Sequence, residues 1–383
     1  MSKDFELLQQ KGRLHQIDAL RGFALLGILI VNIFVFHAPY PYYSEFYGPF
    51  DGVNGVVVEH VVFFCSGKFM FIYAFLFGYS FWMQYEKRQS ERDFSVYWRK
   101  RMLILAGFGI LHILFLSFGD ILLPYAILGL SLPYFVKLSN RKLLIALVLI
   151  NLIPLYEFVL RGFIAFPTIF MQPTQTLDNY IAINGQGSFW EIFKLRIEDY
   201  LSLKNEKLIM YIPKEMSLFL LGIICARNEM AIKQNRKATI IFCVVAISSI
   251  VSMYFFKSNI IAFFDYENNL LQRIILGLII HINEFLHGFL YILGFFLLWK
   301  INIIQKLLFP LTYPGRLSLT NYISQSLICA VIFSGFGYYG KLTPSELVMI
   351  AMVIYIGQLL LSKLWLNYRK YGPLEYLWRQ YSK

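Results

Sequence analysis

Long apolar runs dominate this sequence, and several of them extend for about 20 residues with few charged side chains. A helix of that length spans the hydrocarbon core of a bilayer, which is roughly 30 Å thick. Hydrophobic residues make up 58% of the chain and charged residues only 15%, a balance that excludes a soluble domain of this size. Because backbone groups in lipid must be hydrogen-bonded internally, such runs fold as helices. The sequence therefore predicts an all-α polytopic membrane protein.

The apolar runs predict a bundle of about ten transmembrane helices. The expected spans are 17–36, 56–84, the two arms of a hairpin after residue 101, 143–159, 211–226, 238–256, 270–299, one that begins near residue 311, and 344–366. Lys and Arg gather in the short loops of one side, so both termini are expected in the cytoplasm. We expect one integral membrane domain over residues 1–383. It would comprise five spans in 1–160, a polar outer loop at 161–213 with an amphipathic helix near 189–200, and five spans in 214–383.

The net charge of +12 comes from Lys and Arg in the predicted short loops, where they set membrane orientation. The lipid bilayer is therefore the expected partner, and a nucleic acid is not. The chain has four scattered cysteines and no CxxC pair, so neither a disulfide framework nor a zinc site is expected. An oligomer is compatible with this composition.

The predicted hairpin carries a histidine in its first arm and a carboxylate at its turn. His112 lies eleven residues past Arg101, or about 16 Å along a helix, which places it near the middle of the bilayer. Asp120 ends the turn that begins at Ser117. Such groups are costly in lipid and normally face a cavity, a pathway or a partner. A single histidine can also simply hydrogen-bond across a helix interface.

Polar residues recur in other predicted spans. Asp18, Arg21 and Asn32 fall on one face of the first helix, as a stripe that faces inward or as an ion pair that fixes helix depth. Lys68 lies inside the second span, where we expect it to face a carboxylate or an anionic group.

The later spans carry two further polar rows. In the eighth span, His281, Glu284 and His287 share a face with metal-like spacing, but ligands along one helix do not converge on one ion unaided. We therefore expect a polar lining and no metal. In the ninth span, Arg316 lies on one face, and Asn321 and Gln325 lie on the next. Such a row either binds a polar ligand or bonds to neighbouring helices.

Several segments, in the same order along the chain, resemble the motifs of the YeiB-like bacterial membrane proteins, the family of the domain of unknown function 418. The opening stretch 18–32 (DALRGFALLGILIVN) is similar to that family's first span. Further similar stretches are GKF at 67–69, LFG at 76–78, LH at 111–112, GDILLPY at 119–125, GRLSLTNYISQ at 315–325 and YGPLEYLWR at 371–379.

The family is similar in turn to transmembrane acyltransferases, including heparan glucosaminide acetyltransferases and bacterial O-acyltransferases of surface sugars. The resemblance implies a ten-helix bundle in the bacterial cytoplasmic membrane. It implies acyl-coenzyme A as co-substrate from the cytoplasm and a small-molecule, glycan or lipid acceptor at the outer face. In many bacterial O-acyltransferases a histidine ends the first span; Asn32 stands there in this chain, so a base must come from elsewhere.

The first hypothesis is therefore a membrane-embedded acyltransferase, in which His112 is the base or relay and Asp120 orients an imidazole or takes up the proton. Its other candidate groups are oxyanion donors at Asn32, Asn321 or Gln325, phosphate ligands at Arg21, Lys68 and Arg316, and further polar lining at Asp18 and Glu284. The alternative is a transporter or exporter of a small polar or lipidic substrate, in which the same groups relay protons. A structural or signalling protein is the third hypothesis, but it leaves the buried charges unexplained.

Overall fold

The computed structural model describes residues 14–88, 94–161, 173–202, 211–230, 235–263 and 269–382. These residues fold into helices and connecting turns, and no strand occurs among them. The prediction of an all-helical protein is confirmed. Much of the expected outer loop at 161–213 lies outside the described residues.

Within these ranges, five helices are long and apolar enough to cross a membrane, so the chain is a multi-pass membrane protein. They are α2 (His15–His37), the run from α4 (Gly52–His60) through α5 (Lys68–Arg88), α14 (Arg236–Phe263), α15 (Leu270–Trp299) and α19 (Pro344–Tyr368). A sixth candidate is a bent pair. In it, α16 (Asn302–Leu308) and α17 (Thr312–Arg316) meet α18 (Ser318–Ala330) at 79°.

Three of the predicted spans are interrupted. The second is broken at Ser66–Gly67, where Gly67 has φ +76°, a conformation that glycine adopts without strain. In the hairpin, α6 (Phe94–Phe115) forms the first arm, but the second arm is divided into α7 (Leu122–Gly129) and α8 (Leu132–Phe135). The ninth bends at Leu317. Two further long helices are α9 (Asn140–Arg161) and α13 (Ile212–Arg227).

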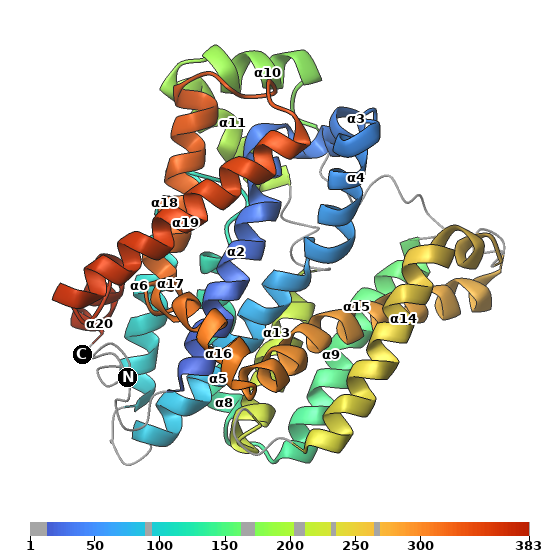
Figure 1. The fold of residues 1–383 in the computed structure, drawn as a ribbon, viewed down its shortest axis with the longest axis vertical. Helices are drawn as coiled ribbons and strands as arrows, with labels where there is room; N and C mark the ends of the chain where they lie inside the picture. The colour runs from blue at the N-terminus through green and yellow to red at the C-terminus, as the bar shows by residue number, and fades with distance from the viewer. Residues whose placement is uncertain are drawn as a thin grey trace.

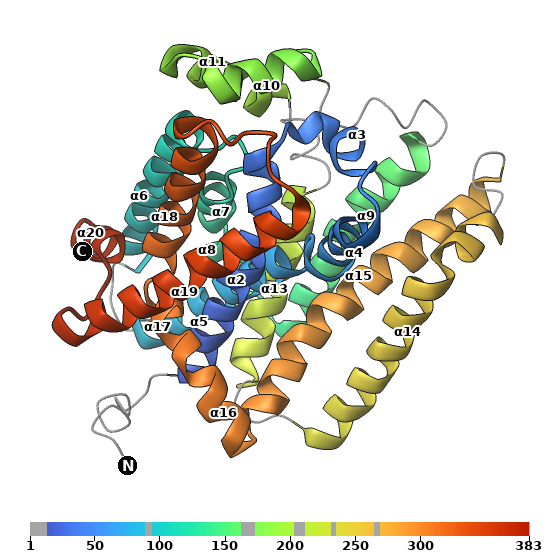
Figure 2. The same cartoon turned by 45° about the horizontal axis from the view of Figure 1, so that its top comes forward.

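The helices surround α2, which runs through the centre of the molecule (Figures 1 and 2). One end is covered by α10 (Leu177–Gln186) and α11 (Phe189–Ser202), close to the short α3 (Tyr43–Tyr47), and we call it the capped end. The opposite end holds the start of α2, the start of α6 and α20 (Pro373–Gln380); we call it the basic end. On one flank, α9, α14 and α15 lie together beside this central group.

Two glycines allow α2 and α17 to approach closely. A Cβ atom on Gly22 would lie 2.0 Å from the carbonyl oxygen of Leu311, and one on Gly315 would lie 1.8 Å from that of Asp18. Such distances are far below van der Waals contact, so no larger residue fits without moving a backbone. This contact places Arg21 and Arg316, the neighbours of the two glycines, beside one cavity.

Candidate functional site

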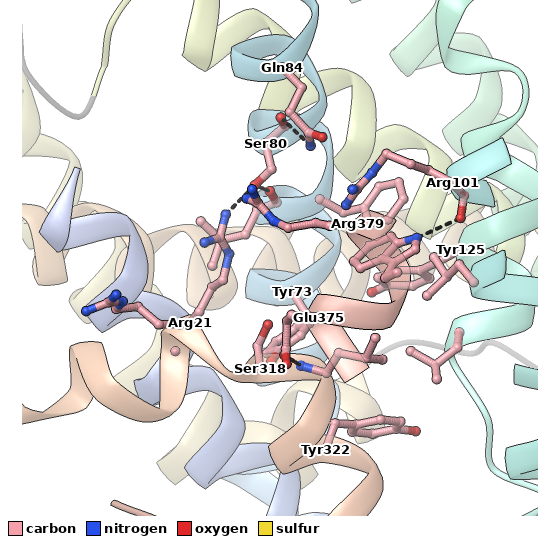
Figure 3. A pocket seen from close by; sticks show the side chains of 18 of the residues that line it. Arg21, Tyr73, Ser80, Gln84, Arg101, Tyr125, Ser318, Tyr322, Glu375 and Arg379 are labelled. Atoms are coloured by element: carbon pink, nitrogen blue, oxygen red, sulfur yellow. Dashed lines mark hydrogen bonds between the residues drawn. The ribbon is translucent and has the colours of Figure 1, made fainter. Parts of the chain in front are cut away.

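A cavity of about 330 Å³ opens at the basic end (Figure 3). Residues of α2, α5, α6, α7, α17, α18 and the C-terminal tail line it. Its charged lining consists of five cations and two carboxylates. The cations are Arg21, Arg101, Arg316, Lys370 and Arg379, and the carboxylates are Asp18 and Glu375. This excess of positive charge suits an anionic ligand.

Two of these arginines are held in fixed positions. Arg21 donates to the Asp18 carboxylate over 2.9 Å and also to the Ser80 hydroxyl on α5. Arg101 packs its guanidinium over the Trp378 ring, 4.0 Å from the ring centroid, and its carbonyl oxygen accepts a 2.8 Å hydrogen bond from the Trp378 indole. Arg101 is only 7% exposed, and no carboxylate of the described residues lies within ion-pair distance of it. A buried guanidinium of this kind favours an anion as its partner.

The C-terminal tail forms one wall of the cavity because Glu375 joins α20 to the start of α18. Its carboxylate accepts hydrogen bonds from the backbone amides of Leu319 and Thr320, over 2.7 and 3.1 Å, and from the Thr320 hydroxyl over 2.6 Å. A carboxylate is stabilising at this position, since the first turn of a helix has unpaired amide groups. This contact holds Trp378 and Arg379 at the cavity (Figure 3).

Tyr322 lines the cavity, and its ring contacts His112. The two rings are stacked, with centroids 5.1 Å apart and planes at 30°. His112 is 2% exposed and is not part of the cavity lining. The cavity thus brings Asp18, Arg21 and Arg316 together, and His112 lies outside its lining, in contact with Tyr322.

His112 contacts a hydroxyl on one side and a carboxylate on the other. Its Nε2 lies 2.8 Å from the Ser326 Oγ on α18, and its Nδ1 lies 3.1 Å from the Asp120 Oδ1. The Nδ1 and Oδ1 atoms are near each other but not aligned for a hydrogen bond. The second carboxylate oxygen of Asp120 accepts a 2.7 Å hydrogen bond from the Leu123 amide, so Asp120 also caps the start of α7. All three side chains are buried.

A second cavity, of about 40 Å³, lies at the capped end. Leu116 and Ala330 belong to its lining. Leu116 lies one helical turn after His112, and Ala330 lies one turn after Ser326. Arg196 and Asp199 of α11 also line it. Arg196 donates a 2.5 Å hydrogen bond to the Phe115 carbonyl oxygen and so joins α11 to the end of α6. The pair formed by His112 and Ser326 therefore lies between two cavities.

Burial raises the pKa of Asp199 at the capped end to about 6, from an ordinary value of 3.8. Its carboxyl group accepts hydrogen bonds from Tyr180 over 2.5 Å and from Thr174 over 3.1 Å. These bonds lower the pKa, but the loss of hydration outweighs them.

We expect the protonated Asp199 to stabilise the contact between α10 and α11, so that opening of this contact costs more free energy at pH 4 than at pH 7.5. Because the pKa is higher in the folded state, this stabilisation is full below pH 4 and is lost as the pH rises through about 6. The shift corresponds to about 3 kcal/mol. Hydrogen exchange of the α10 and α11 amides, corrected for intrinsic rates, measures it. Asp199→Asn should remove the pH dependence, and a dependence that persists in this variant would contradict the assignment.

Other predicted site residues lie away from both cavities. The Asn321 side-chain amide donates to the Ser362 hydroxyl over 3.0 Å, and the Gln325 side-chain amide donates to the Gln358 Oε1 over 2.8 Å. Asn321 and Gln325 therefore join α18 to α19. Bonding to a neighbouring helix was one of the two roles considered for this row, beside binding of a polar ligand. Asn32 is half-buried and lines neither cavity.

Lys68 and Glu284 belong to a different region, beside α15. Lys68 begins α5 at the helix break and donates to the Val62 carbonyl oxygen over 3.4 Å. Glu284 forms a 2.5 Å ion pair with Lys214 of α13. In the same helix as Glu284, His281 contacts Asn151 and His287 contacts Tyr291. Across the described part of the chain, no three His, Cys, Asp or Glu side chains group as a metal site would require.

Several residues of this arrangement were not predicted as site residues, among them Arg101, Tyr322, Ser326, Glu375, Trp378 and Arg379. Arg101 lies among basic residues at the start of the predicted hairpin, and Arg379 ends the 371–379 motif, so neither position alone indicated a cavity. A signal was present for Tyr322, because it follows Asn321 within the 315–325 motif. For Ser326 there was none, since its contact with His112 joins residues 214 positions apart.

Comparison with known proteins gives a family and three distant relatives. Residues 225–383 match the family described as "Protein of unknown function (DUF418)". The chain is 28% identical to the uncharacterized protein YxaH of Bacillus subtilis, over 96% of this chain and 93% of that protein. It is 28% identical to an uncharacterized 39.9 kDa protein of Bacillus acidopullulyticus, over 96% and 93%. It is 24% identical to the uncharacterized protein YeiB of Escherichia coli, over 95% and 94%.

Proposed function

We propose that this chain, which belongs to the DUF418 family through residues 225–383, is a membrane-embedded acyltransferase. In this proposal an acyl group moves from acyl-coenzyme A to a hydroxyl or amine acceptor at the outer face of the bacterial cytoplasmic membrane. The observation that supports the proposal is the cationic cavity lined by Tyr322, whose ring is stacked on His112. A binding site for a polyanion thus lies next to a candidate base.

The proposed topology has about ten spans and both termini in the cytoplasm. In addition to the six candidate spans, α6, α9, α13 and the divided α7–α8 arm would cross the bilayer. The orientation follows from the arginines and lysines at the basic end, which the positive-inside rule places in the cytoplasm. The cavity at the basic end would then open toward the cytoplasmic pool of acyl-coenzyme A.

Arginines suit the donor because they bind phosphate groups through two parallel hydrogen bonds. Arg21, Arg101 and Arg316 reach the cavity from three different helices, which matches a ligand that carries several phosphates. A volume of about 330 Å³ is at the lower end of the range for small-molecule sites. The cavity would therefore enclose part of the donor and leave the remainder at the basic end.

In the proposed reaction, His112 removes the proton from the attacking group and later returns it to the leaving thiolate. Asp120 lies beside Nδ1, where it favours a proton on that nitrogen and leaves Nε2 free to accept. The Tyr322 ring must rotate before a thioester can reach His112, because the two rings are stacked. Such a motion is typical of enzymes that close their sites to water.

Direct binding of acetyl-coenzyme A to the purified protein tests the proposal. We expect Arg101→Gln and Arg316→Gln each to raise the Kd about tenfold or more, the effect of losing a charge-assisted hydrogen bond. Lys300→Gln is the matched control, because Lys300 is an exposed cation outside the cavity lining. Isothermal titration calorimetry in detergent measures the affinities. Absence of binding by the wild type, together with substrate flux in vesicles, would favour the transporter instead.

A further inference from the structure

We propose that Ser326 is the nucleophile that carries the acyl group from the cavity at the basic end to the cavity at the capped end. This inference rests on the proposed acyltransferase function and adds a covalent intermediate to it. The side chains of Ser326, His112 and Asp120 form a hydroxyl–imidazole–carboxylate series, in which Nε2 lies 2.8 Å from the Ser326 Oγ and Nδ1 lies 3.1 Å from the Asp120 Oδ1; a small turn of the ring would align this second contact as a hydrogen bond. That series activates a serine in unrelated hydrolase folds and is recognised by geometry, not by sequence order.

The hydrogen bonding of Ser326 extends beyond its own helix. Such a serine usually bonds to the carbonyl oxygen four residues earlier in its own helix. The Ser326 hydroxyl lies 3.4 Å from the Tyr322 carbonyl oxygen, and the shorter contact, 2.8 Å, is to the imidazole of α6. The hydroxyl is therefore placed to donate its proton to the His112 Nε2, as a nucleophile requires.

The position of Ser326 along α18 supports a relay. Tyr322, one turn before it, lines the cavity at the basic end, and Ala330, one turn after it, lines the cavity at the capped end. At 1.5 Å per residue, each cavity wall is about 6 Å away along the helix. An acyl ester on Ser326 would thus be within reach of a donor on one side and an acceptor on the other, without either substrate crossing the protein.

The chemistry balances in two transfers. In the first, the Ser326 Oγ attacks the thioester carbonyl carbon, a carbon–oxygen bond forms, and the carbon–sulfur bond breaks. The proton of the serine passes to the His112 Nε2 and then to the departing thiolate of coenzyme A. In the second, the acceptor hydroxyl or amine attacks the serine ester and gives its proton to His112, which returns it to the Ser326 oxygen. The chain ends as it began, with the acyl group on the acceptor.

Mass spectrometry of the intact protein, quenched after incubation with acetyl-coenzyme A alone, tests the intermediate. We expect the wild type to gain the mass of one acetyl group, and peptide mapping to place that group on Ser326. Ser326→Ala should gain none and should lose turnover by about a thousandfold. Ser326→Cys should form a thioester that neutral hydroxylamine removes. Ser362→Ala is the matched control, because Ser362 is also buried and hydrogen-bonded between helices, but its bond is to the Asn321 amide and not to an imidazole.

The outcomes separate this inference from the function on which it rests. If Ser326→Ala turns over acetyl-coenzyme A at the wild-type rate, the serine relay is wrong and direct transfer or acylation of His112 replaces it. An acetyl group mapped to His112 in the wild type would also overturn the relay and leave the acyltransferase in place. If the wild type neither binds nor consumes acetyl-coenzyme A, both proposals are wrong.

Discussion

His112→Gln is expected to lower acyl transfer by about 10²–10⁴-fold, the usual contribution of a general base, while the protein stays folded and inserted. Glutamine retains a polar group between Ser326 and Asp120 but cannot accept and return a proton. The loss should appear in kcat, because His112 does not line the cavity that would bind the donor. Turnover of acetyl-coenzyme A with a supplied acceptor measures the rate, and calorimetry measures the Kd.

His60→Gln is the control for this experiment. His60 is exposed, and its ring bonds to the carbonyl oxygen of Val56 in its own helix. This variant should keep wild-type turnover. Unchanged turnover in His112→Gln would remove His112 from the mechanism, even if the protein proved to be an acyltransferase.

Gly315→Leu is expected to disrupt the bundle around the cavity. A Cβ atom alone would lie 1.8 Å from the Asp18 carbonyl oxygen, so a leucine must push α17 away from α2. Overpacking of this kind costs about 1–3 kcal/mol, and here backbone atoms on both sides oppose the relaxation. We expect a lower melting temperature in detergent and a loss of acetyl-coenzyme A binding, because Arg21 and Arg316 no longer share one cavity.

The matched control is Gly357→Leu in α19. A Cβ atom on Gly357 would meet no atom within 4 Å, so the same substitution in another membrane helix has room. Thermal unfolding followed by tryptophan fluorescence, with size-exclusion chromatography, compares the two variants. Equal melting temperatures for Gly315→Leu and Gly357→Leu would show that the α2–α17 contact is not a determinant of the bundle.

Hydropathy predicted where the helices lie better than how they bend. The eighth span was expected over 270–299 and forms α15, Leu270–Trp299, because a long apolar run has few alternatives in lipid. The breaks at Ser66–Gly67 and at Leu317 were not predicted. Within an apolar run, a break leaves the hydropathy unchanged; it depends on tertiary contacts such as the approach of Gly315 to α2.

The candidate site was predictable only where its residues are near in sequence. His112 and Asp120 lie on the two sides of one turn, so the hairpin brings them together, and the structure places them 3.1 Å apart. Ser326 comes from a distant helix, and single-sequence periodicity contains no information about that pairing. Lys68 was expected to bind a phosphate of the donor, but it begins α5 at the helix break and does not line the cavity at the basic end.

The stacked ring of Tyr322 has an electrical consequence. Two solvent-accessible pockets that face each other across a bilayer would form a proton leak if they merged, and each elementary charge that crossed would dissipate about 2.3 kcal/mol per 100 mV of membrane potential. With its ring stacked on His112, Tyr322 would close the path between the two pockets if both open to water. In an acyltransferase that takes its donor from one face and its acceptor from the other, as proposed, this closure would preserve the membrane potential.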